Sequence, residues 1–130
     1  MRFLLDTGIF LWSLDRFEHL SERAQEVLTG NEEIYLSAAS SWEIVIKWGL
    51  GKLNLPKEPP LLIPEAMTRF DVRPLFITQV HTLAVAELPI HHKDPFDRLL
   101  IAQAQAEDMT LMTADFELRK YPVEILWSGK

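Results

Sequence analysis

Short apolar runs alternate with longer segments of helical spacing along this 130-residue chain. Four runs are typical of buried strands because they are brief, rich in branched and aliphatic residues, and bounded by polar or turn residues. These expected strands are RFLLD (2–6), EIYLS (33–37), MTLMTAD (109–115) and VEILW (123–127). DVRPL (71–75) is expected to be a short strand or an extended link.

Between these strands, apolar residues recur at the three- and four-residue intervals of amphipathic helices. The expected helices are TGIFLWSLD (7–15), LSERAQEVLTG (20–30), ASSWEIVIKWGLGKL (39–53), EAMTRF (65–70), ITQVHTLAVAELP (77–89) and PFDRLLIAQAQAED (95–108), with a helical turn in FELRKYP (116–122). In the third helix, the spacing turns Trp42, Val45, Ile46 and Gly49 inward. The proline-rich NLPKEPPLLIP (54–64) is expected to be a loop.

Strands that alternate with helices predict a three-layer α/β/α sandwich with a central, mostly parallel sheet. The length suits a single domain spanning residues 1–130, and the hydrophobic fraction of 48% is enough to fill one core. In such sheets, sites form at the carboxyl ends of the strands. Asp6 and Asp115 both follow expected strands, so that edge is where chemistry is expected.

The amino-acid composition argues against several classes of protein and of binding site. There is no cysteine, which excludes disulfides and cysteine-based zinc sites and fits a reducing cytoplasm. No apolar run approaches the roughly 20 residues that span a bilayer, and Asp6 and Gly8 interrupt the apolar N-terminus, so neither a membrane segment nor a secretory signal is expected. The formal net charge of −6 argues against nucleic-acid binding by bulk charge alone.

Each acidic candidate also has a purely structural explanation. Asp6 and Asp115 are placed to cap the segments that follow them. Ser40 and Glu43 have the spacing of a capping box, in which the glutamate bonds back to the helix start. Asp94 is placed as an N-cap before a proline at the first helical position. Asp97 would then lie in the first turn, where an acid interacts favourably with the helix dipole. Because one cap needs only one acid, the cap itself does not explain Asp97.

Taken together, the four acids Asp6, Glu43, Asp97 and Asp115 indicate more than caps. Strand ends and first helical turns converge on one rim of an α/β sandwich. Two carboxylates about 5 Å apart repel by roughly 3 kcal/mol at an effective dielectric of about 20. Such a cluster needs protons or a cation, and hard oxygen ligands select Mg²⁺ or Mn²⁺. Divalent ions held by carboxylates activate water and stabilise charge on phosphoryl oxygens, which predicts phosphodiester hydrolysis.

Four stretches carry a family likeness: LLDTGIFLW, SAASSWEIVIKWGLGKL, LPIHHKDPFDRLLIAQA and LMTADFELRKY. In this order, and spread over nearly the whole chain, they resemble the PIN-domain ribonucleases, and closely the VapC toxins of bacterial and archaeal toxin–antitoxin pairs. The resemblance implies an Mg²⁺- or Mn²⁺-dependent endoribonuclease. It also implies an antitoxin partner whose C-terminal segment blocks the site, and a homodimer that pairs helix faces.

The resemblance assigns Asp6, Glu43 and Asp97 as the core metal-binding acids and Asp115 as the fourth. We expect Asp6 and Asp97 to bind the metal directly. Glu43 binds it or orients the attacking water, and Asp115 completes the cluster. Thr113, before Asp115, matches a hydroxyl that often supports the site, and Thr7, beside Asp6, is expected to do the same.

Neighbouring residues leave alternatives open. Asp94 is interpreted as a cap or a supporting group. His91 and His92 are interpreted as a loop edge rather than ligands of a transition metal. Three lysines with Trp48 among them form either a phosphate-binding and stacking surface or an ordinary solvated helix end. These lysines are Lys47, Lys52 and Lys57.

Two other functions compete with a nuclease. A phosphatase of the haloacid-dehalogenase type also places an aspartate after its first strand, but it needs a second aspartate at the position of Gly8. A non-catalytic PIN-like module would bind RNA or a regulator without cutting. The complete set of four acids argues against this second alternative.

Overall fold

The computed structural model describes residues 1–130 and contains a five-stranded parallel sheet. Its strands are β1 (Arg2–Leu5), β2 (Glu33–Ser37), β3 (Val72–Leu75), β4 (Thr110–Thr113) and β5 (Ile125–Trp127). They lie in the order β3-β2-β1-β4-β5, and every neighbouring pair is parallel. The predicted parallel sheet is confirmed, and 71–75 supplies its edge strand.

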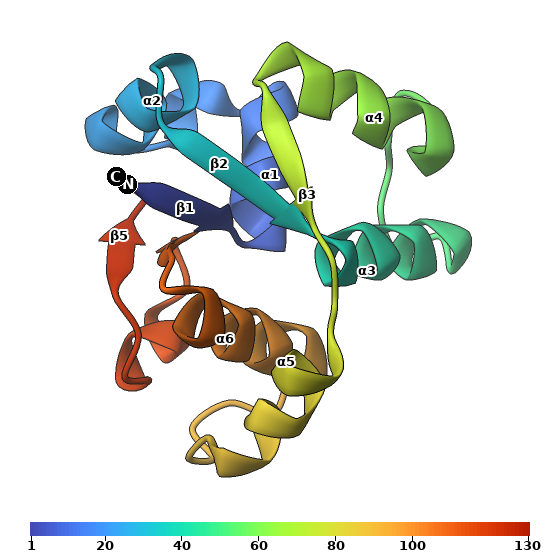
Figure 1. The fold of residues 1–130 in the computed structure, drawn as a ribbon. Helices are drawn as coiled ribbons and strands as arrows, with labels where there is room; N and C mark the ends of the chain where they lie inside the picture. Colours follow the sequence, from blue (N-terminus) through green and yellow to red (C-terminus); the bar gives the residue numbers. More distant parts are fainter.

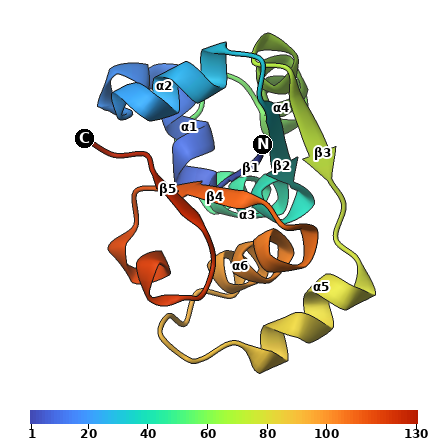
Figure 2. The same cartoon turned by 60° about the vertical axis from the view of Figure 1, so that its left-hand side comes forward.

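Helices cover both faces of the sheet, as Figures 1 and 2 show. They are α1 (Thr7–Asp15), α2 (Glu22–Thr29), α3 (Ala38–Gly49), α4 (Pro59–Arg69), α5 (Gln79–Ala84) and α6 (Pro95–Glu107), with 3₁₀ turns η1 (Phe17–His19), η2 (Val85–Glu87) and η3 (Phe116–Lys120). Alternate residues of β1 enter different cores: Phe3 and Leu5 pack towards α1, α2 and α4, whereas Leu4 packs towards α6. The period-two alternation of a strand therefore builds the predicted three layers.

The strand order places the ends of β1 and β4 side by side at the middle of the sheet. The Asp6 backbone N–H donates to the Met112 carbonyl at 3.0 Å, one residue beyond the last paired position of β1. The chain runs from β1 to β2 and β3 on one side, and returns through α6 to β4 on the other. A crevice outside the carboxyl ends of the strands is expected where connections diverge in this way.

The expected loop over residues 54–64 is wrong in its second half. Helix α4 begins at Pro59 and continues through Pro64 to Arg69. Prolines at the first two helical positions are tolerated because those N–H groups have no partner within the helix. Burial of Leu62 and Ile63 then stabilises the helix in spite of Pro64.

The buried face of α3 also differs from the prediction. Trp42 is 61% exposed and Val45 is 44% exposed, whereas Ser40, Glu43 and Ile44 are buried. The helix starts directly after β2, because the Ser37 side chain accepts from the Ala39 N–H at 3.0 Å and caps it. This start fixes the rotation of α3 and turns a partly polar face towards α1. The apolar period alone had predicted that the face with Trp42 and Val45 would be buried.

Two smaller points concern the second half of the chain. The helix expected over 77–89 is shorter and divides into α5 and η2. Thr78 and His81 form a capping box at the start of α5, and this reciprocal pair sets its first residue.

None of the helices has the length and the apolar character needed to cross a membrane.

Candidate active site

A cavity of about 740 Å³ lies at the carboxyl edge of the sheet, where the chain leaves β1 and β4. All four predicted acids line it, together with Asp94 and Glu117. Its only basic lining residues are Lys47 and Lys52. The structure therefore brings the predicted acids, which are far apart in sequence, to one place.

Asp6 is a helix cap and a cavity residue at the same time. One carboxylate oxygen, Oδ1, accepts from the Ile9 N–H at 2.7 Å and caps α1. The other, Oδ2, accepts a short hydrogen bond from the Thr113 hydroxyl across the β1–β4 junction. The pKa of Asp6 is raised to about 7, chiefly by burial and in part by the charges of Asp97 and Asp115, while these two hydrogen bonds lower it.

Glu43 reaches the cavity from the second turn of α3. Its Oε1 accepts from the Thr7 hydroxyl at 2.7 Å, and its Oε2 lies 2.5 Å from the Lys47 ammonium. The capping-box interpretation of Ser40 and Glu43 is wrong, because Ser37 caps this helix. Ser40 instead lies 3.0 Å from the Thr7 hydroxyl. Thr7 therefore supports the site through Glu43.

Asp94 and Asp97 have different tasks at the start of α6. Asp94 Oδ1 accepts from the Phe96 and Asp97 N–H groups at 2.9 and 3.2 Å, which confirms it as the N-cap before Pro95. The Asp97 side chain makes no cap and points into the cavity. Burial raises its pKa to about 6, as does the charge of Asp94, while a hydrogen bond from His92 lowers it.

The two carboxylate oxygens of Asp115 have different contacts, as those of Asp6 do. Its Oδ1 accepts from the Glu117 N–H at 2.9 Å and caps η3. Its Oδ2 lies 3.8 Å from His92 Nε2. The Asp115 N–H donates to the Thr113 hydroxyl at 3.0 Å, so one threonine contacts both Asp6 and the backbone of Asp115.

His92 lies in the loop before α6, as expected, and its ring also contacts one of the acids of the cavity. Its Nε2 lies 2.9 Å from Asp97 Oδ2. His92, Asp94 and Asp97 are also the group whose potential ligand atoms all lie within 4.8 Å of one another. The one signal in the sequence is the spacing His92-x-Asp94-x-x-Asp97. His91 points elsewhere and packs edge-on against Tyr121, with ring centroids 5.2 Å apart.

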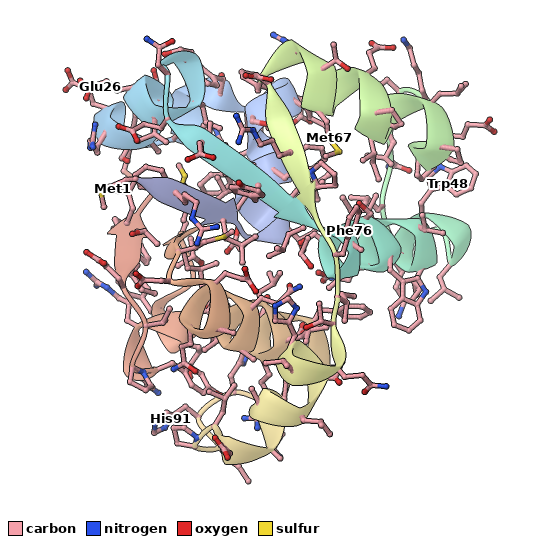
Figure 3. The ribbon with its side chains drawn as sticks, in the orientation of Figure 1. Met1, Glu26, Trp48, Met67, Phe76 and His91 are labelled. Carbon is pink, nitrogen blue, oxygen red and sulfur yellow. The ribbon has the colours of Figure 1, made fainter.

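The three lysines have separate environments. Lys47 and Lys52 line the acidic cavity, whereas Lys57 pairs with Glu65 at 2.7 Å beside a second cavity. The hydrogen bond to Glu43 raises the pKa of Lys47, and the charges of Asp94 and Asp97 add to this effect. Trp48 lies outside the cavity at the far end of α3 (Figure 3), so the structure separates this expected surface into parts.

The donor set fits a hard divalent cation. Six carboxylates face two ammonium groups in the cavity, and Lys47 is already paired with Glu43. Burial first, and the neighbouring carboxylates in addition, raise the pKa of Asp6 to about 7 and that of Asp97 to about 6. Carboxylate oxygens at this density are the ligands preferred by Mg²⁺ and Mn²⁺, and the chain has no cysteine to favour a softer metal.

Comparison with known proteins agrees with this architecture. Residues 3–124 match the PIN domain family. Among curated proteins, Ribonuclease VapC16 of Mycobacterium tuberculosis is 45% identical over 49 residues. That alignment covers 38% of this chain and 35% of the relative, so only about a third of the relative is matched.

Solved structures share the fold over nearly the whole chain. VapBC2 from Rickettsia felis, determined with a DNA fragment from its promoter, superposes with a TM-score of 0.75 at 18% identity, covering 98% of this chain and 99% of that one. DNA-bound VapBC from Salmonella typhimurium gives a TM-score of 0.68 at 17% identity, covering 97% of each chain. FitAcB from Neisseria gonorrhoeae gives 0.64 at 20% identity, covering 96% of each. At these identities, the likeness establishes the three-layer fold.

Proposed function

The chain belongs to the PIN domain family, and from that premise we propose that it is a metal-dependent endoribonuclease and the toxin of a toxin–antitoxin pair. The observation that carries the proposal is the convergence of Asp6, Glu43, Asp97 and Asp115 on one cavity. Asp6 and Asp115 also cap the segments that follow them, but Glu43 and Asp97 make no cap, so capping alone does not explain the convergence. The 45% identity of one segment to a VapC ribonuclease supports RNA as the substrate.

Asp6, Glu43, Asp97 and Asp115 would hold the Mg²⁺ or Mn²⁺ ion. When bound, such an ion supplies a stronger nucleophile from water and stabilises charge on the phosphoryl oxygens. The chain's own residues orient the acids. Two hydrogen bonds fix both oxygens of Asp6, and Thr7 and Lys47 fix both oxygens of Glu43. Lys47 and Lys52 are the cations positioned to attract a substrate phosphate.

Thr113 is the residue whose removal tests this orientation. We expect Thr113→Val to weaken Mn²⁺ binding by about 10- to 100-fold, because partners that orient metal ligands typically contribute that much. Valine has nearly the same shape, so the fully buried side chain is replaced without a cavity. Calorimetric titration with Mn²⁺ measures the effect. Thr110→Val, on the same strand and also buried but outside the cavity, is the matched control.

The activity is tested by incubating the purified protein with end-labelled RNA and Mn²⁺ or Mg²⁺. Endonucleolytic products that disappear with EDTA support the proposal. RNA that is bound but left intact under every metal condition would favour the non-catalytic PIN-like module instead.

The proposed antitoxin has a candidate docking place beside the active site. A second cavity of about 260 Å³ lies between α1, the 53–57 segment and α4. It shares Leu11 and Leu53 with the acidic cavity, so one extended segment can occupy both. Co-purification with the product of a neighbouring small gene, together with loss of RNA cleavage, tests this partner. Unchanged cleavage in the complex would contradict it.

A homodimer is the second proposed assembly. Helix α3 exposes Trp42 and Val45, and α5 exposes Val80 and Leu83, so both helices present apolar faces to solvent. We expect Val80→Glu to convert a dimer into a monomer, because a buried unpaired charge at an interface is costly. Val80 is 67% exposed, so the substitution leaves the monomer folded. Size-exclusion chromatography with light scattering measures the mass, and a wild-type monomer at high concentration would refute the assembly.

A further inference from the structure

Phe116 is a large aromatic side chain that remains exposed at the wall of the acidic cavity. It is 65% exposed, lines the cavity and directly follows Asp115 in the chain. Nothing in the fold covers its outer surface, although exposed apolar area costs about 25 cal/mol per Å² relative to burial. Within the proposed endoribonuclease, this ring has no assigned task.

The ring is held rigidly from behind. Phe116 packs against Trp127 in a tilted arrangement, with ring centroids 4.5 Å apart and an interplanar angle of 31°. The Arg119 guanidinium lies 4.6 Å from the Trp127 ring and 5.4 Å from the Phe116 ring. The cap that Asp115 makes to the Glu117 N–H fixes the backbone on either side of Phe116. The ring is therefore preorganised next to a proposed metal-binding acid.

We propose that Phe116 is a stacking platform for an unpaired nucleobase beside the scissile phosphate. This inference rests on the proposed ribonuclease function and adds a substrate contact at the same site. Exposed aromatic rings bind single strands in this way because every base has a π-face that can stack. A duplex keeps its bases stacked on one another, so it cannot offer one to Phe116.

Electrostatics favours this arrangement over binding by bulk charge. The chain has a formal net charge of −6, and the cavity contains more carboxylates than lysines. A phosphodiester is therefore repelled at long range and must be held by local contacts. Lys47 and Lys52 line the α3 side of the cavity and Phe116 lines the η3 side, with Arg119 outside the cavity but 5.4 Å from the Phe116 ring. A strand that crosses the acids then meets attractive groups on both sides.

The test uses 12-nucleotide single-stranded RNAs of mixed sequence in which 2-aminopurine is moved through each position. Binding is measured with the full-length Asp97→Asn variant, which keeps the RNA intact. We expect stacking to quench the fluorescence at one position, and Phe116→Ala in that background to abolish the quenching. The dissociation constant should rise by about 5- to 100-fold, as base–aromatic stacking predicts. A 12-base-pair RNA duplex should bind more weakly than the single strand.

Two variants sharpen the result. Phe116→Trp should retain the quenching, because it keeps an aromatic face. Phe76→Ala should change nothing, because Phe76 is 72% exposed but lies outside the cavity, on the link between β3 and α5 (Figure 3). Thermal melting verifies that each variant is folded.

The outcomes separate the platform from the proposed function. Wild-type cleavage with Mn²⁺, together with RNA binding that Phe116→Ala leaves unchanged, overturns the platform and leaves the ribonuclease in place. Position-specific quenching without wild-type cleavage supports the platform and refutes the ribonuclease. If Phe116→Ala impairs only antitoxin binding, or if the duplex binds as tightly as the single strand, the inference is wrong.

Discussion

Asp97→Asn is expected to lower the rate of Mn²⁺-dependent RNA cleavage by more than about 100-fold, because even partners outside a metal's ligand set contribute 10- to 100-fold. Asp97 points into the cavity from the first turn of α6 and makes no cap. Asparagine keeps its size and removes the charge that would hold a dication. The helix itself loses little, because Asp94 provides its cap.

The matched comparison is Asp94→Asn, which changes the other acid of the same DPFD segment. Asparagine caps a helix about as well as aspartate, so α6 stays intact. We expect a loss of less than about tenfold, because the Asp94 oxygen that accepts from Phe96 and Asp97 is occupied by the cap. Asp15→Asn, at the exposed end of α1, should have no effect. Equal losses at Asp94 and Asp97 would show that the two acids share one role.

Asp6→Asn is expected to stabilise the metal-free protein while it removes activity. Burial raises the pKa of Asp6 to about 7, so the folded state binds this proton more tightly than the unfolded state, whose pKa is near 3.8. Unfolding then releases a proton, and stability falls as the pH rises from about 4 to about 7. In EDTA at pH 8, the variant should be more stable by about 4 kcal/mol, falling to about 1 kcal/mol at pH 4.5.

Chemical denaturation of wild type and variant at the two pH values measures this difference. Asparagine keeps an oxygen for the Ile9 N–H, and its amide can donate to the Thr113 hydroxyl, so the local hydrogen bonds survive. Saturating Mn²⁺ should close the gap by stabilising wild type alone. A variant that is less stable than wild type at pH 8 would show that Asp6 is a structural cap and no more.

The sequence predicted those parts of the fold that depend on local pattern. Five strands and most helices follow from the apolar period, and Asp94 caps α6 as expected. The site followed from topology, since acids placed after parallel strands necessarily share one edge of the sheet. Asp6 and Asp115 show why single positions were ambiguous: each uses one oxygen as a cap, and the other oxygen contacts Thr113 or lies near His92.

What the sequence did not predict depends on contacts between distant segments. The apolar period of α3 favoured burial of Trp42, but the contact between Thr7 and Glu43 and the cap at Ser37 set the observed rotation. His92 contacts Asp97 only because the loop before α6 folds back over the helix start. No local pattern distinguishes Phe116 from an ordinary core aromatic, since its exposure depends on the position of Trp127.

The central claim is that the carboxylates of Asp6, Glu43, Asp97 and Asp115, from separate segments, bind Mg²⁺ or Mn²⁺ at the carboxyl edge of the sheet. Calorimetric titration of Mn²⁺ into the wild-type protein at pH 7.5, repeated with Asp6→Asn, Asp97→Asn and Asp15→Asn, tests it most directly. The account predicts saturable binding that is lost in the first two variants and retained in the third. Binding of equal affinity in all four proteins, or none in the wild type, would contradict it.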